Sequence, residues 1–479
     1  MNFKTIVNIL AALLIVMGIS MLIPLLISFL YNEPDFNGHL KSSIICFCLG
    51  LPVWYLTRKN RVLSSKDGFA IVSLAWLLVA LTGTFPFYFT DSISNFTDAW
   101  FESMSGVTTT GSSILSDIEA LPHGVLFWRS FLQWIGGMGI IVFTIAILPL
   151  LGVGGVQLFK AEVPGPVADK IRPRVKETAK ILWMVYIGFT LIETILLTVF
   201  GMPLFDAICH SFTTMPTGGF STQNASIGAY DSNAIQYIII IFMFIAGANF
   251  TLHFRAITGN FKSYSKDSEF LTYFGIIILT TTLIFTNINS LNQSWSHDSF
   301  LSSLFQTVSI VTTTGYGSSD YELWPFFSQF LIIILMFVGG MGGSTGGGMK
   351  VARIILLIKF AATETRRMLH SRAIIPIRIG SRYISEDVIR NTLGFFLIYI
   401  SIFTLTTLIL TMLNLDFESA IGAAASAIGN IGPGLGDYGP TDNYSLLHPF
   451  GKWMLSFCML LGRLEVFTVM VLFSRTFWK

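Results

Sequence analysis

Charged side chains are scarce in this chain. Asp, Glu, Lys and Arg make up 12% of its 479 residues, whereas soluble globular domains contain about 25%. Hydrophobic residues account for 53%, and the mean hydropathy is +0.68. This composition excludes an ordinary soluble domain and indicates an integral membrane protein.

Cysteine and paired catalytic groups are also lacking. The four cysteines, Cys46, Cys48, Cys209 and Cys458, show no spacing typical of a metal site, and free cysteine usually behaves as a small buried residue. No apolar span contains an HExxH sequence, paired aspartates or a serine–histidine pair. We therefore expect neither an enzyme nor an organic cofactor on this chain, and nothing indicates a nucleic-acid partner.

Long apolar segments recur along the whole chain. A helix that crosses a bilayer needs about 20 mostly apolar residues. Ten segments meet this need, near residues 5–30, 40–57, 69–90, 125–150, 180–200, 233–254, 270–288, 325–358, 391–413 and 446–474. The first continues from Lys4 without a small-residue cleavage pattern, so we expect a retained helix and not a signal peptide. The predicted fold is an all-α integral membrane protein.

Basic residues are nearly absent from every second connection between these spans. Only Lys41 of the 29 Lys and Arg residues, but 16 of the 27 acidic residues, lie in the connections 31–41, 91–123, 201–232, 289–324 and 414–450. The positive-inside rule places these connections outside and both termini in the cytoplasm. An acidic outer face would attract cations. Exclusion of Lys and Arg from translocated loops explains the same pattern equally well.

Four of these outer connections share one pattern, which is a short apolar stretch followed by a polar, glycine-bearing stretch. Their central glycines, Gly111, Gly219, Gly315 and Gly432, lie 108, 96 and 117 residues apart, and this indicates an internal repeat. The third copy, T-T-G-Y-G, differs at one position from the T-V-G-Y-G of potassium channels. We therefore divide the chain into two N-terminal helices (1–66) and four pore repeats (67–178, 179–266, 267–385 and 386–479).

Irregular backbone at membrane depth is tolerated only where it packs inside protein or lines water. Four such loops are best satisfied by a pseudo-fourfold arrangement around one axis, where their carbonyl oxygens replace the hydration shell of a monovalent cation. The preceding half-helices, for example 98–106 and 205–213, would aim their negative C-terminal ends at the cavity below. The predicted filter residues are Thr109, Thr110, Gly111, Thr217, Gly218, Gly219, Thr313, Thr314, Gly315, Asn430, Ile431 and Gly432.

The stretch 338–350 contains seven glycines inside a span too long for one crossing. We expect the helix over 325–359 to break there. A phosphate loop is excluded because the stretch lacks GK[ST] and no strand precedes it. Close helix packing through small residues is an alternative explanation, but the number of glycines favours a loop that crosses the pore below the filter.

Arg463 and Glu193 are ionisable residues that lie within predicted spans. Arg463 should face the interior, because an arginine at mid-membrane costs at least about 2.5 to 3.5 kcal/mol on insertion scales. It either lines the pore or is buried against carbonyls or Glu193. Glu465 is a poor partner for Arg463 because residues two apart lie on different helix faces.

Over nearly its whole length, the chain resembles the TrkH branch of the bacterial Trk/Ktr/HKT superfamily of potassium transporters. The resemblance rests on the four central glycines, on the G-G-S-T-G-G-G-M-K stretch at 342–350, on G-R-L-E at 462–465 and on the two helices before the first repeat. It implies a bacterial inner-membrane protein that carries potassium and rubidium, bound at the filter residues.

The resemblance also implies a gate and partners. The implied gate residues are Gly342, Gly343, Ser344, Thr345, Gly346, Gly347, Gly348 and Arg463. The implied assembly is a homodimer on a cytosolic TrkA-type ring that binds NAD and ATP. The basic residues Lys350, Arg353, Arg366, Arg367, Arg372, Arg378 and Arg382 either contact anionic lipid or form the docking surface for this ring.

The loops depart from a symmetric potassium filter. Ser112, Phe220 and Pro433 occupy positions where the third loop has Tyr316, so we expect incomplete outer oxygen rings and weaker selectivity. A secondary carrier that couples ion movement to a solute or a proton is the alternative function. It would show repeats around a midplane site, whereas the loops here all lie on one side.

Overall fold

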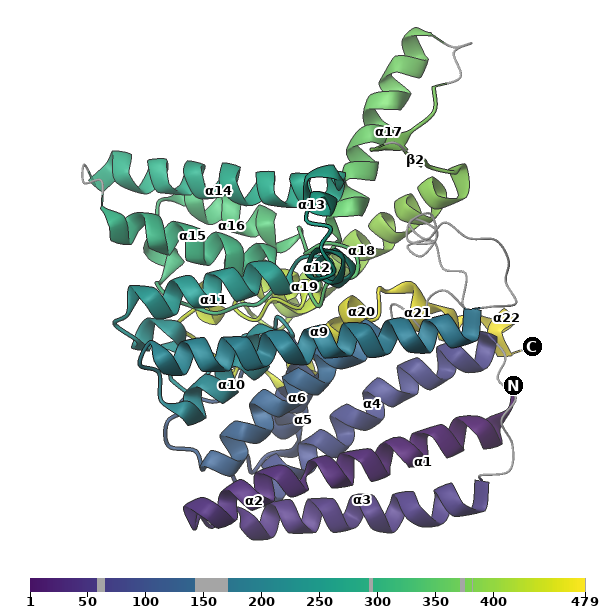
Figure 1. The fold of residues 1–479 in the computed structure, drawn as a ribbon, viewed down its shortest axis with the longest axis vertical. Coiled ribbons are helices and arrows are strands. Elements are labelled where there is room, and N and C mark those ends of the chain that lie inside the picture. The colour runs from purple at the N-terminus through teal and green to yellow at the C-terminus, as the bar shows by residue number, and fades with distance from the viewer. Residues whose placement is uncertain (58–64, 143–170, 293–295, 371–374, 381, 479) are drawn as a thin grey trace.

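The computed structural model describes residues 1–57, 65–142, 171–292, 296–370, 375–380 and 382–478 (Figure 1). These ranges are predominantly helical. A short antiparallel pair, β1 (Arg378–Ile379) and β2 (Arg382–Tyr383), follows the helix that projects from the bundle. The predicted all-α membrane fold is confirmed.

Six described helices are long and apolar enough to cross a membrane, and eight spans result if each of two bent helix pairs is counted as one. Large apolar side chains point outward from several of them, including Leu56, Ile195, Leu397 and Met412. A soluble protein would not expose this much apolar surface. The outer surface therefore suits contact with lipid.

The first three helices form a layer at one edge of the bundle (Figure 1). They are α1 (Phe3–Ser20), α2 (Leu22–Tyr31) and α3 (Phe36–Thr57). Helix α1 packs on α3 and α4, and α2 packs on α6. The N- and C-termini lie at the same end of the bundle (Figure 1), as expected for an even number of spans.

The rest of the chain repeats one unit of a first helix, a short half-helix and a second helix. The first helices are α4 (Ser65–Phe89), α9 (Ile171–Val199), α14 (Ser268–Asn292) and α18 (Glu386–Met412). The half-helices are α5 (Phe96–Val107), α10 (Leu204–Thr214), α15 (His297–Val311) and α19 (Phe417–Gly429). The second helices are α6 (His123–Val142), α11 (Asn233–Ala246) with α12 (Phe250–Ile257), α16 (Phe326–Met336) with α17 (Val351–Leu369), and α20 (Pro449–Arg463) with α21 (Phe467–Met470).

Short elements complete the described chain. They are α13 (Lys262–Lys266), α22 (Arg475–Trp478) and the 3₁₀ turns η3 (Ser226–Ala229), η4 (Tyr321–Leu323), η5 (Gly436–Tyr438) and η6 (Val471–Phe473).

The half-helices connect the units into a closed ring. Each packs on the helices of its own unit and on the second helix of the preceding one: α10 on α6, α15 on α11, α19 on α16, and α5 on α20. The last of these contacts joins the fourth unit to the first. This cyclic order is the pseudo-fourfold arrangement predicted from the spacing of the glycines.

Polar residues cap the starts of three half-helices. The side chains of Asn95, Ser296 and Asp416 each accept a hydrogen bond from a backbone N–H in the first turn that follows, and this satisfies a donor that the helix leaves free. The C-terminal ends point into the protein, where each helix passes directly into its loop. The sequence thereby fixes where each half-helix begins and where it releases its backbone.

The second helices break more often than we predicted. The expected break between α16 and α17 is present. Helices α11 and α12 also meet at 104°, and α20 and the segment from Phe467 meet at 107°, where we had predicted unbroken spans over 233–254 and 446–474. The Asn249 side chain caps α12, which explains the first extra break.

Candidate functional site

Each half-helix is followed by a loop with the same backbone path. We call residues 109–113, 217–221, 313–317 and 430–434 loops 1 to 4. The first residue of each loop has a left-handed φ, and the third is a glycine with φ between +77° and +111°. Left-handed φ values are uncommon for residues other than glycine, so their recurrence in all four loops reflects one conformation built four times.

The four loops meet one another in order. A side chain at Gly111 would collide with the carbonyl oxygen of Gly218 in loop 2. Gly219 approaches the carbonyl of Thr314, Gly315 approaches that of Ile431, and a Cβ on Gly432 would lie 2.9 Å from the carbonyl oxygen of Thr110. Each central glycine therefore faces the residue before the next central glycine. The loops close a ring, and only glycine allows the approach.

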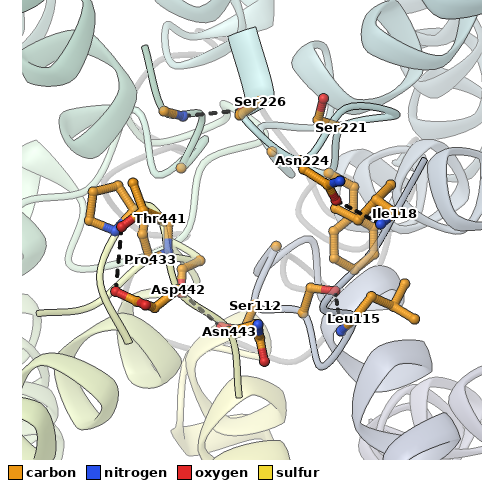
Figure 2. A pocket seen from close by; sticks show the side chains of 18 of the residues that line it. Ser112, Leu115, Ile118, Ser221, Asn224, Ser226, Pro433, Thr441, Asp442 and Asn443 are labelled. Carbon is orange, nitrogen blue, oxygen red and sulfur yellow. Dashed lines mark hydrogen bonds between the residues drawn. The ribbon is translucent and has the colours of Figure 1, made fainter. Parts of the chain in front are cut away.

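All four central glycines line one cavity of about 140 Å³ (Figure 2). Ser112, Pro433, Thr441, Asp442 and Asn443 surround it in Figure 2. The convergence predicted from the repeat is thus present, and all twelve expected filter residues lie at or next to this ring. Among the described residues, none donates a hydrogen bond to the carbonyls of Thr110, Thr314 or Ile431, which leaves these oxygens available to a cation.

Loops 3 and 4 are held by different contacts at and just after their central glycines. The Tyr316 hydroxyl of loop 3 is buried and bonds to Thr213 at 2.5 Å and to the His210 carbonyl at 3.0 Å. The Gly432 carbonyl of loop 4 instead accepts hydrogen bonds from Ser426 at 2.7 Å and Ser112 at 2.9 Å. Two side chains of the protein therefore already donate to this carbonyl oxygen of loop 4.

Two residues that the sequence analysis did not single out, Glu102 and Arg129, hold the backbone of loop 2 and of the segment after loop 1 in place. Glu102 and Arg129 form a buried ion pair at 2.9 Å. Glu102 also accepts a hydrogen bond from the Ile114 amide, and Arg129 donates to the Ser221 carbonyl. The available signal was a basic residue inside an apolar span, which is usually functional or structural.

The glycine-rich segment between α16 and α17, residues 337–350, crosses directly beneath the ring. We call it the intramembrane loop. The Gly347 amide donates to the Thr313 hydroxyl at 2.6 Å, and the Thr345 hydroxyl donates to the Met215 carbonyl at 2.9 Å. A side chain at Gly347 would also collide with the Gly429 carbonyl at the end of α19. The loop therefore contacts three of the four repeats just below their filter residues.

The break between α11 and α12 provides hydrogen-bond partners for the intramembrane loop. Backbone groups exposed by the break between α11 and α12 bond to it: the Gly247 carbonyl accepts from the Met341 amide at 2.9 Å, and the Phe250 amide donates to the Gly343 carbonyl at 3.1 Å. Peptide groups freed inside a membrane need such partners. A sequence pattern read one span at a time cannot reveal a break whose partner lies about 90 residues away.

Arg463 is buried and bonds to carbonyls. Its guanidinium donates to the Thr345 carbonyl of the intramembrane loop at 2.7 Å and to the Gly136 carbonyl of α6 at 3.4 Å. Glu193 is fully buried, and its carboxylate has no hydrogen-bond partner among the described residues. Of the two readings left open for Arg463, the structure supports burial against carbonyls, one of which belongs to the predicted gate.

Two carboxylates hold the ends of the intramembrane loop. Glu269 on α14 accepts hydrogen bonds from the Gly342 amide at 2.7 Å and from the Ala352 amide at 3.1 Å, at the start of α17. Glu465 pairs with Arg353 on α17 at 2.5 Å. It does not pair with Arg463, which agrees with the prediction from their spacing of two residues. The loop and α17 are thereby connected to the break of the last span.

The donor set determines the chemistry available at the ring. In the part of the chain that the structure describes, no three His, Cys, Asp or Glu residues are grouped to hold a metal ion. The ring instead offers neutral backbone carbonyls at the ends of four half-helices. Such oxygens suit a weakly hydrated monovalent cation, and the helix ends favour positive charge.

Comparison with known proteins gives consistent matches along the chain. The family model TrkH, described as a cation transport protein, matches residues 38–479. The Trk system potassium uptake proteins TrkH of Salmonella typhimurium and Escherichia coli K12 are each 42% identical, with full coverage of both chains. The crystal structure of the potassium transporter TrkH from Vibrio parahaemolyticus matches with a TM-score of 0.92 at 39% identity, again with full coverage. The similarity thus includes the loops and the segment beneath them.

Proposed function

The chain belongs to the TrkH family of cation transport proteins, and we propose that it conducts potassium, and also rubidium, across the bacterial inner membrane through the ring formed by loops 1 to 4. Relatives with full-length similarity are potassium uptake proteins by name, which supports potassium as the transported ion. The chain itself is a membrane transporter and not an enzyme.

One observation carries the proposal. The four pre-glycine carbonyls, those of Thr110, Gly218, Thr314 and Ile431, each face the central glycine of the neighbouring loop. A closed ring of this kind can replace water around a dehydrated ion from all sides at once. Loops that served only packing would not need to share both left-handed positions.

The intramembrane loop is proposed as the gate, with Arg463 holding it closed. The contacts of this loop support the proposal, because the Gly347 amide bonds to Thr313 of loop 3 and Arg463 bonds to the Thr345 carbonyl. A guanidinium beneath the filter also repels cations. Opening requires the loop to leave these partners.

Family membership supports a proposal for regulation and assembly. We propose a homodimer with cytoplasmic termini that docks on a cytosolic TrkA-type ring, with NAD and ATP bound by that ring. The proposed docking surface is the basic region formed by the last turn of α17, with Arg366 and Arg367, and by the segment that follows it, with Arg378. Deletion of residues 366–382 should abolish binding of the ring in a pull-down. Undiminished binding would exclude this surface.

Flux measurements test the proposed function. Purified protein in liposomes should pass rubidium down its gradient without any organic substrate, at imposed voltage and pH. A strict dependence on a solute gradient would favour the carrier instead. Rubidium flux that follows an imposed proton gradient at zero voltage would show that uptake is coupled to protons.

A further inference from the structure

Loop 2 differs from the other three at one position. The residues before the central glycines are Thr110, Thr314 and Ile431 in loops 1, 3 and 4, but Gly218 in loop 2. Two adjacent glycines, Gly218 and Gly219, give this loop the most freedom to rotate its peptide groups. A carbonyl that rotates away would open the ring on one side.

A side chain from another repeat takes the space that Gly218 leaves. Gln133 on α6 is fully buried, and a Cβ on Gly218 would collide with its side-chain amide. Gly218 does not adopt the left-handed conformation, so glycine is required there for space and not for backbone geometry. Gln133 and Gly218 therefore fit together as a pair.

The Gln133 amide bonds to the loop on both sides of Gly219. Its Nε2 donates to the Gly218 carbonyl at 2.7 Å, and its Oε1 accepts from the Phe220 amide at 3.1 Å. One planar group thus fixes two peptide units, one of which supplies an oxygen of the ring. One turn earlier on the same face of α6, Arg129 bonds to the Ser221 carbonyl and stacks 4.3 Å from the Phe220 ring centroid.

We propose that Gln133 is a positioning residue that sets the ion selectivity of loop 2 by holding the Gly218 carbonyl in the ring. This inference rests on the proposed function of the loops as a filter. Loops 1 and 3 have threonine hydroxyls at the same position, and each bonds to the threonine two residues earlier, Thr110 to Thr108 and Thr314 to Thr312. The Thr110 hydroxyl also accepts a hydrogen bond from Asn430 of loop 4. Loop 2 has no hydroxyl at this position, and Gln133 of the neighbouring repeat bonds to its Gly218 carbonyl instead.

The first test is Gln133→Met, which keeps the length of the side chain and removes both hydrogen bonds. The rubidium-to-sodium permeability ratio in liposomes should fall at least about fivefold, the effect expected from losing a buried hydrogen bond. Gln329→Ala is the matched control, because the Gln329 amide on α16 also donates to two backbone carbonyls, those of Glu322 and Trp324, outside the ring. An unchanged ratio in Gln133→Met, with a lowered melting temperature, would reduce Gln133 to a structural role and overturn the proposal.

A compensating pair keeps the proposal testable if Gln133→Met does not fold. Gly218→Ala alone should lower the ratio because its methyl group displaces the Gln133 amide. Gln133→Ala with Gly218→Ala should retain more selectivity than the product of the two single effects predicts. Additive effects would show that the two residues act independently and would contradict the proposal.

Hydrogen exchange separates this inference from the proposed function. The Phe220 amide should exchange faster in Gln133→Met than in the wild type, whether or not the protein conducts rubidium. A wild type without flux but with this exchange difference would overturn the proposed function and leave the support of loop 2 by Gln133 in place. Equal exchange in a conducting protein would do the reverse.

Discussion

Loops 1 to 4 and the intramembrane loop are all segments of irregular backbone in a membrane protein, yet they are held in different ways. Loops 1 to 4 share one conformation and pack against one another. The intramembrane loop exists once, is rich in glycine and is held by separate contacts from Thr313, Glu269 and Arg463. The ring opens if any one of its four loops moves away. The intramembrane loop is held by a few hydrogen bonds, each worth about 0.5–1.5 kcal/mol net, so it can move once these are broken. The first design suits selection and the second suits gating.

The largest effect is predicted for a substitution of Gly315, which tests the role of loops 1 to 4. Gly315→Ser adds a side chain at φ +80° directly against the Ile431 carbonyl. The potassium-to-sodium permeability ratio should fall at least about tenfold, equivalent to about 1.4 kcal/mol. Gly317→Ser is the control two residues away, because a Cβ there has its nearest neighbour at 3.6 Å. If both variants keep the wild-type ratio, Gly315 does not belong to a filter.

Shortening the intramembrane loop tests its proposed role as the gate. Removal of residues 346–348 eliminates the bond between Gly347 and Thr313 and retracts the loop from the ring. Rubidium flux without the regulatory ring should rise several-fold, while the permeability ratio stays the same. A fall in flux, or a changed ratio with unchanged flux, would show that the loop does not occlude the path.

Glu269→Gln should give a smaller effect of the same kind. The carboxylate that accepts from Gly342 and Ala352 becomes a weaker, neutral acceptor, so the loop should detach more readily. We expect regulator-independent flux to rise about two- to fivefold, in keeping with a loss of about 1 kcal/mol or less. Glu364→Gln serves as control, because Glu364 lies on α17 but pairs with Arg367. Equal flux in both variants would contradict the role of Glu269.

The smallest effect concerns Glu322 in the 3₁₀ turn η4. Burial, reinforced by the nearby charge of Asp320, raises the pKa of Glu322 to about 7. Because the folded state favours the protonated form, Glu322 should make the protein less stable as the pH rises from about 4.5 through about 7. Glu322→Gln should flatten this part of the melting temperature's pH profile. An unchanged profile would mean that Glu322 titrates normally.

The repeat could be predicted from sequence because its signal is local and occurs four times. The spacing of Gly111, Gly219, Gly315 and Gly432, together with the intolerance of lipid for unpaired peptide groups, was enough to predict convergence around one axis. The break at residues 337–350 followed from composition alone. These features depend on the backbone, which glycine constrains directly.

The supporting side chains could not be predicted in the same way. Gln133 and Arg129 act across repeats and Glu269 acts within one repeat, and the partners in these five bonds lie 73 to 92 residues away. Such pairs have no helical or strand spacing that marks them in one sequence. The breaks after α11 and α20 were missed for the same reason, since the loop that they accommodate lies elsewhere in the chain.

The four arcs of the ring are encoded separately, and this has an evolutionary consequence. In a homotetrameric channel one codon change alters every quadrant at once, so most changes at the axis are ruinous. In the filter that we propose, Thr110, Gly218, Thr314 and Ile431 can each be exchanged alone, so natural selection could adjust ion preference one quarter at a time.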